Sequence, residues 1–161
     1  MKDEKYASHF KNLSDMKEFV GQELGLSDWI CIEQERIDNF AKATEDEQWI
    51  HVDVEKSKLH SPYKRTIAHG FLTLSLASKF AYETYSVGDV TMGVNYGLNK
   101  VRFPNATPSG AFIRGRVSLL DYQEIKGGAK CTLKMVMEIK GEEKPTCVAE
   151  FIGLVYTDAP V

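Results

Sequence analysis

The spacing of the hydrophobic positions changes once along the chain. Up to Tyr85 the clearest segments repeat apolar residues every three or four positions, which is typical of helices. From Thr91 onward apolar and polar residues alternate, which is typical of strands. Short N-terminal elements and helices, followed by a meander of long antiparallel strands, predict an α+β fold.

The most informative segment runs from Gly70 to Tyr85. Its apolar residues cover most of a helical wheel, and Ser75, Lys79 and Glu83 form the clear polar stripe. A helix that is apolar over so wide an arc is enclosed by other elements. The simplest architecture is a curved antiparallel sheet wrapped around this long central helix.

The other early segments complete a domain that we expect to span residues 1–161. Residues 1–20 place apolar side chains three positions apart, which predicts a helical extension packed on the outside of the domain. We predict a strand over Ser27–Ile32, a short amphipathic helix over Glu33–Ala43, and an irregular loop with room for a helical turn over Asp53–Thr66.

Four segments predict the strands of the sheet: Thr91–Val101, Ala111–Tyr122, Cys131–Ile139 and Thr146–Tyr156. Gly127-Gly128 predicts a hairpin turn between the second and the third. The last segment is apolar on both faces, so we expect it to be a central strand or to lie against a second subunit.

The composition is that of an ordinary globular protein, with 43% apolar and 27% charged residues and a net charge of −3. This charge argues against nucleic acid or an anionic membrane as the main partner. The charged N-terminus precedes no signal-peptide core, and no apolar run approaches the ~20 residues of a membrane span. The separated cysteines Cys31, Cys131 and Cys147 predict free thiols in a cytoplasmic protein, with neither disulfides nor a metal site.

Asp46 and His51 are the candidate catalytic pair. A carboxylate and an imidazole held together can share one water, removing a proton from it and delivering a proton to carbon. The alternative is structural, with Asp46 capping a turn and His51 a half-buried histidine whose hydrogen bonds are satisfied. Their spacing alone does not separate these two interpretations.

A second candidate feature is the segment His69-Gly70 at the start of the enclosed helix. Backbone N–H groups at a helix N-terminus stabilise negative charge, and a glycine lets a ligand approach closely. A thioester oxygen there would be held as its enolate develops, although Gly70 could equally serve a tight turn. Ser78, in the apolar arc, needs a partner, either the carbonyl of Leu74 or Asp46.

Three phrases together resemble the MaoC-like, (R)-specific enoyl-CoA hydratase family, in its single-domain branch of the nodulation-protein-N type. These phrases are Gln48–Asp53, Ile67–Ser75 and Asn95–Phe103. The resemblance implies a hot-dog fold, a homodimer and an acyl-coenzyme A substrate. It also implies reversible addition of water to a trans-2-enoyl-CoA, giving the (R)-3-hydroxyacyl-CoA without metal or organic cofactor.

The resemblance also implies roles for individual residues. Asp46 and His51 would hold and activate the water, Gly70 N–H would polarise the thioester oxygen, and Ser78 would orient the Asp46 side. The family pattern has Asn-Pro where this chain has Gln48-Trp49, which leaves the acyl-chain preference open. We expect the substrate to contact four further residues: Gln48, Trp49, His69 and Phe71.

Two other functions fit the same fold. One is an enzyme acting on another acyl-CoA, either a dehydratase of branched or dicarboxylic acyl groups or a thioesterase. The other is an acyl-binding module without catalysis. For the nucleotide end of coenzyme A the candidate residues are four basic ones on or beside predicted strands: Lys100, Arg102, Arg114 and Arg116. The alternative for each is a place on a solvated strand face.

Overall fold

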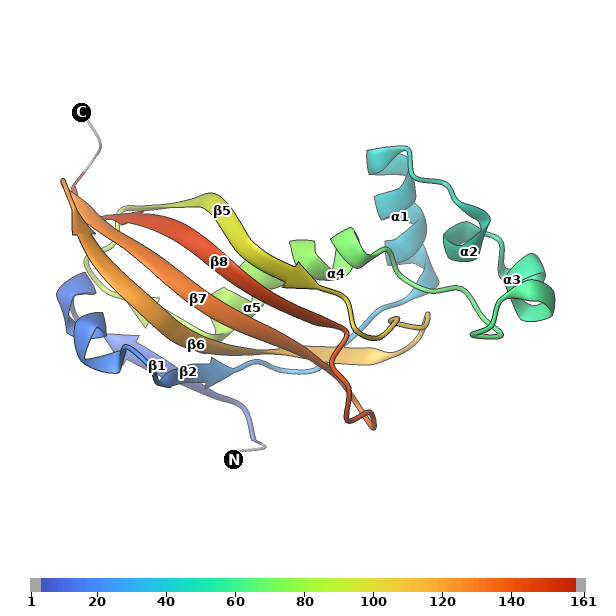
Figure 1. Ribbon diagram of the computed structural model, residues 1–161, viewed down its shortest axis with the longest axis horizontal. Helices are drawn as coiled ribbons and strands as arrows, with labels where there is room; N and C mark the ends of the chain where they lie inside the picture. The colour runs from blue at the N-terminus through green and yellow to red at the C-terminus, as the bar shows by residue number, and fades with distance from the viewer. Residues whose placement is uncertain (1–3, 159–161) are drawn as a thin grey trace.

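The computed structural model describes residues 4–158, and one curved sheet dominates it (Figure 1). The strand order is β4-β1-β2-β6-β7-β8-β5, and β3 pairs with β6 in addition. The bounds are β1 Tyr6–Phe10, β2 Glu23–Leu26, β3 Ile30–Cys31, β4 Tyr85–Val87, β5 Met92–Arg102, β6 Phe112–Ile125, β7 Gly128–Ile139 and β8 Cys147–Tyr156. The predicted strand meander and the α+β class are thus confirmed.

The enclosed helix is confirmed, with an interruption. It consists of α4 (Gly70–Ser75) and α5 (Ala77–Thr84), which meet at Leu76. The sheet curves around this helical run (Figure 1). Phe80 is fully buried against β6, where a Cβ on Gly115 would stand 2.6 Å from the Phe80 Cβ. The absence of a side chain at Gly115 therefore lets the helix lie directly on the sheet.

The helical extension predicted within residues 1–20 is confirmed only in its second half, and it is part of the core. Tyr6–Phe10 forms strand β1, which pairs with β2 on one side and with β4 on the other. A 3-10 helix, η1 (Leu13–Phe19), follows it and buries Leu13 and Met16 in the core. The apolar spacing of three corresponds to the 3-10 helix. The strand and this helix make the segment part of the domain.

Helices α1 (Gln34–Thr44), α2 (Trp49–Val52) and α3 (Val54–His60) lie together beyond one end of the sheet (Figure 1). The first confirms the predicted amphipathic helix. The third occupies the first half of the segment predicted as an irregular loop with room for a helical turn, Asp53–Thr66, and the second half is irregular. The Asp53 side chain caps this helix by accepting a hydrogen bond from the Lys56 N–H. Among residues 4–158 no helix is long and apolar enough to cross a membrane.

Two of the four basic candidates for nucleotide binding have structural partners. Arg114 and Arg116 are each 8% exposed and donate to the two carboxylate oxygens of Glu138 at 2.7 and 2.8 Å. Arg116 also bonds Glu23 at 2.9 Å, and the Arg114 guanidinium lies 4.3 Å from the centre of the Trp29 ring. These pairs hold the Glu138 pKa below its usual value against the opposing effect of burial. Both arginines therefore fasten β2, β6 and β7 together.

Candidate active site

His51 lies on the short helix α2 with its ring buried, 8% exposed. Its Nδ1 is 2.7 Å from the main-chain carbonyl oxygen of Ile67. A carbonyl only accepts, so Nδ1 carries the proton and Nε2 is left with a free lone pair. Burial lowers the His51 pKa most, and the neighbouring His69 lowers it further, while the Ile67 carbonyl and Asp46 act in the opposite direction. His51 is thus built as a neutral base.

Asp46 reaches the site from the loop between α1 and α2. Glu45 ends α1 in the left-handed conformation, with φ 61°, and turns the chain back toward His51. The Asp46 residue is exposed, and its carbonyl oxygen accepts a 2.9 Å hydrogen bond from Nε2 of His69. The loop therefore brings the carboxylate to the site although no helix or strand carries it.

One ligand atom from each of Asp46, His51 and His69 lies within 4.8 Å of the other two. Such a group has donor atoms that suit a transition metal ion. However, an imidazole binds a metal in its ring plane, for zinc at about 2.0–2.1 Å. The two rings stack at 3.8 Å with planes 24° apart, so one ion cannot lie in both planes at that distance. The stacked arrangement therefore does not suit one metal ion bound by both rings.

A cavity of about 220 Å³ connects His51 with Gly70. Gly70 is the first residue of α4, so intrahelical bonding leaves its N–H free. A Cβ at this position would meet the Phe103 ring at 3.1–3.2 Å, so the glycine admits the aromatic ring that forms a cavity wall. His51 and Gly70, predicted from separate segments, thus face one space.

Three buried threonines line the same cavity and form a chain of hydroxyls. The Thr146 Oγ1 donates to the carbonyl of Asn105 at 3.1 Å, and it contacts the Thr107 hydroxyl. Thr107 lies in turn 3.5 Å from the hydroxyl of Thr73 on α4. Because the Thr146 hydroxyl donates its proton to the Asn105 carbonyl, the Thr107 hydroxyl must donate to Thr146. The chain fixes the hydroxyl orientations beside the base.

The predicted substrate contacts lie outside this cavity. Gln48 is exposed at the start of α2, and Trp49 packs under the Lys56 ammonium at 4.9 Å from the ring centre. Phe71 is 70% exposed and meets the edge of Phe103. His69 is buried behind His51, without a place among the cavity-lining residues. None of the four residues predicted to contact the substrate therefore lines the cavity around His51.

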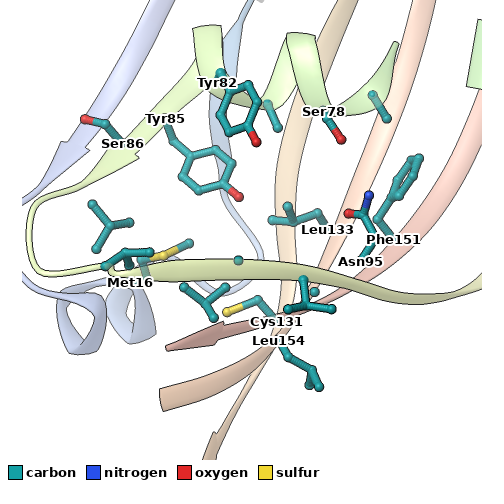
Figure 2. A pocket seen from close by; sticks show the side chains of 18 of the residues that line it. Met16, Ser78, Tyr82, Tyr85, Ser86, Asn95, Cys131, Leu133, Phe151 and Leu154 are labelled. Carbon is teal, nitrogen blue, oxygen red and sulfur yellow. The ribbon is translucent and has the colours of Figure 1, made fainter. Parts of the chain in front are cut away.

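Ser78 lines a different and larger cavity, of about 430 Å³, between α5 and the sheet. Figure 2 shows Ser78 on α5 and Asn95 on β5 pointing into this space. Among the described residues Ser78 makes no hydrogen bond to Asp46, so the orienting role predicted for it has no direct contact behind it. The surrounding walls are mainly apolar and include Ala81, Leu133 and Phe151.

Sequence reasoning missed several residues of the site. Gln34 donates to the His51 carbonyl at 2.8 Å and also contacts Thr66, so α1 braces α2. Thr107 and Phe103 reach the cavity from the segment after β5. The phrase ending at Phe103 carried the one available signal, since it formed part of the resemblance.

The chain matches the MaoC like domain over residues 15–140. It is 42% identical over 144 residues to "3-hydroxyacyl-thioester dehydratase Z" of Mycobacterium tuberculosis, covering 89% of this chain and 95% of that protein. It is 41% identical over 153 residues to "Nodulation protein N" of Rhizobium leguminosarum bv. viciae, covering 93% and 94%.

The structure is similar to that of a "Monoamine oxidase regulatory protein" from Archaeoglobus fulgidus, with a TM-score of 0.75 at 22% identity over 94% of this chain and 97% of that one. Its curved sheet around a helix is the hot-dog fold. On the domain match and the two sequence relatives, the chain belongs to the MaoC-like domain family, as the three motif phrases predicted.

Proposed function

We propose that this protein is a hydro-lyase that reversibly adds water to a trans-2-enoyl-CoA and forms the (R)-3-hydroxyacyl-CoA. The observation that carries the proposal is the neutral His51 base, which shares a cavity with the free N–H of Gly70 and lies beside the Asp46 carboxylate. The (R) configuration and the coenzyme A carrier rest on the family resemblance.

The chemistry needs three events, and each has a group to perform it. The lone pair of His51 Nε2 takes a proton from water while the water oxygen bonds to C3 of the enoyl group. The electron pair of the C2=C3 bond moves toward the thioester oxygen, where Gly70 N–H stabilises the developing enolate. The Asp46–His51 pair then delivers a proton to C2. Dehydration is the same sequence in reverse.

The sequence relatives support an acyl thioester as the substrate. The mycobacterial relative is named as a dehydratase of 3-hydroxyacyl thioesters, and the match covers nearly its whole length. At 42% identity, a shared reaction class is the simplest expectation. We expect no metal or organic cofactor, and a cytoplasmic location.

The larger cavity is the proposed site of the acyl chain. Its volume of about 430 Å³ falls in the range of small-molecule pockets, ~300–1,000 Å³. Figure 2 shows Leu133 and Phe151 at its walls, as an apolar chain requires. It opens beside α5, which continues the helical run that starts at Gly70.

The exposed edge strand β5 supports a homodimer. It is the last strand of the sheet and pairs with β8 alone. It exposes large apolar side chains in sequence, among them Val94 at 41%, Tyr96 at 65% and Leu98 at 43%. An unpaired edge of this length and character invites another strand. A second copy, pairing its own β5 antiparallel, would cover both edges at once.

The decisive experiment supplies crotonyl-CoA and follows the loss of absorbance at the enoyl band. We expect turnover by the wild type and a loss of at least about 10³-fold in kcat for His51→Ala and for Asp46→Asn. His60→Ala, on the exposed end of α3, is the matched control. Release of free thiol without hydration would instead identify a thioesterase, and thermal stabilisation without turnover would identify a binding module.

A further inference from the structure

His69 touches every part of the proposed catalytic centre without lining the cavity. It is 2% exposed, and its ring stacks on His51 with 3.8 Å between the centroids. Its Nε2 donates to the Asp46 carbonyl at 2.9 Å. Its own carbonyl accepts the Thr73 N–H at 3.2 Å and so starts α4 directly before Gly70.

We infer that His69 is the positioning residue of the catalytic centre, holding Asp46 and His51 in register with each other and with Gly70. The inference rests on the hydratase function proposed above. His69 acts on the reaction through its neighbours and makes no contact with the reacting atoms.

His69 acts first on the position of Asp46. Among the described residues the Asp46 carboxylate has no hydrogen bond, and the residue is exposed in a loop. The bond from His69 to its carbonyl therefore anchors the main chain from which this carboxylate projects. A misplacement of about 1 Å can lower a rate about 100-fold, so this anchor bears directly on turnover.

The hold on His51 is the second step. The Ile67 carbonyl fixes the tautomer of His51, but one hydrogen bond leaves the ring free to rock about it. The stacked face of His69 removes that freedom. Phe40 of α1 packs against His69 in turn, 5.0 Å away with a 53° tilt, so the stack is supported from behind.

The choice of histidine is the third step. Nδ1 of His69 is buried without a partner, which is unfavourable for a polar atom. A phenylalanine would fill the same volume without this penalty, so the packing alone does not call for an imidazole. The bond that Nε2 donates to Asp46 is the reason that we assign to it.

Two variants separate the two holds. His69→Phe keeps a stacked ring but removes the donor, and His69→Gln keeps an N–H near the Nε2 position but removes the ring. We expect kcat for crotonyl-CoA hydration to fall about 10–100-fold in His69→Phe, with KM within about twofold of wild type. The kcat of His69→Gln should be at least about threefold higher than that of His69→Phe. His60→Phe, on exposed α3, is the control and should match wild type.

A second readout needs no turnover. NMR titration of the His51 ring, together with the amide resonances of residues 45–48, reports the geometry in each folded variant. We expect His69→Phe to shift these amides more than His69→Gln does. Both variants should move the His51 titration to higher pH, because the neighbouring His69 lowers the His51 pKa and Asp46 raises it.

The outcomes are distinct. A tenfold rise in KM with unchanged kcat in His69→Phe would make His69 a substrate contact and overturn the inference. Wild-type kinetics in that variant, or unchanged His51 titration and amide resonances in both, would overturn it as well. A wild type that hydrates no enoyl thioester would refute the proposed function, while the NMR comparison would still decide the role of His69.

Discussion

His51 donates its Nδ1 proton to the carbonyl of Ile67 at 2.7 Å, and this bond joins two segments that lie 16 residues apart. The backbone returns the contact, since the Ile67 N–H bonds the Ile50 carbonyl at 3.1 Å. The base is therefore attached to the strand-like segment that leads into Gly70. Its tautomer and its distance from the Gly70 N–H are set together.

The first prediction concerns pH. Burial lowers the pKa of His51 from its ordinary value of 6.5, and the base works only when it is deprotonated. We therefore expect kcat/KM to stay constant as the pH falls to 6.5 and to decline only at lower pH. The profile of kcat/KM between about pH 5 and 8 measures this limb. A limb centred above the ordinary histidine value would contradict the prediction.

The second prediction concerns Gly70→Ala. The added Cβ would meet the Phe103 ring at 3.1–3.2 Å, so the ring or the start of α4 must shift by a few tenths of an ångström. We expect kcat/KM to fall about 10–100-fold while the melting temperature changes little, since alanine is favourable in a helix. Gly97→Ala, where a Cβ meets nothing within 4 Å and which lines neither cavity, is the control. Equal activity in the two variants would remove Gly70 from the mechanism.

The third prediction concerns chain length. Ala81 lines the larger cavity from α5, so Ala81→Leu fills part of the space assigned to the acyl chain. Crotonyl-CoA should still be hydrated, and trans-2-octenoyl-CoA should lose about tenfold or more in kcat/KM. Ala43→Leu, at the exposed end of α1, is the matched substitution. Parallel losses for both substrates would place the acyl chain elsewhere.

The fourth prediction concerns assembly through β5. Tyr96 is 65% exposed on this edge strand, and Tyr96→Glu puts a charge into the proposed interface. Light scattering after size exclusion should give a dimer for the wild type and a monomer for the variant. Leu59→Glu, equally exposed on α3 at 71%, should remain dimeric. A monomeric wild type would refute the dimer.

The fifth prediction concerns the threonine chain. Thr107→Val keeps the shape of the side chain but leaves the hydroxyls of Thr73 and Thr146 without their shared partner. Unfolding by urea should show a loss of about 1–3 kcal/mol in stability. Thr91→Val, directly before β5, removes an exposed hydroxyl that donates to the Tyr156 carbonyl at 3.1 Å, where water can replace it, and should lose about 0.5 kcal/mol or less. The two midpoints, compared at equal slope, give the difference.

The strands and the enclosed helix were predictable because their apolar periods express burial directly. The break at Leu76 was not, since no proline or glycine marks it. The first strand was missed because a five-residue segment is too short to separate a period of two from a spacing of three. The tertiary partner β4 decided its conformation.

At the proposed site, the types and order of Asp46, His51 and Gly70 singled these residues out. The fold brings Asp46 close to His51 and places Gly70 on the same cavity as His51. The position of the His69 ring behind His51 was not predictable, because a sequence motif does not specify on which side of the backbone a side chain lies. The ion pairs of Arg114 and Arg116 could not be predicted, although alternation places both residues on one strand face. Their shared partner, Glu138, lies on a neighbouring strand that sequence alone does not pair in register.

The contact between Gly115 and Phe80 sets how deep the helix sits in the sheet. Any larger residue at 115 would lift Phe80, and with it the whole of α5, away from β6. Lifting the helix would widen the acyl cavity and tilt α4 and Gly70 away from the threonines of the opposite wall. The glycine hydrogen at position 115, in place of a methyl group, thus sets the spacing between α5 and the sheet. The range of substrates that a homologue accepts should vary with the residue that it carries at this position.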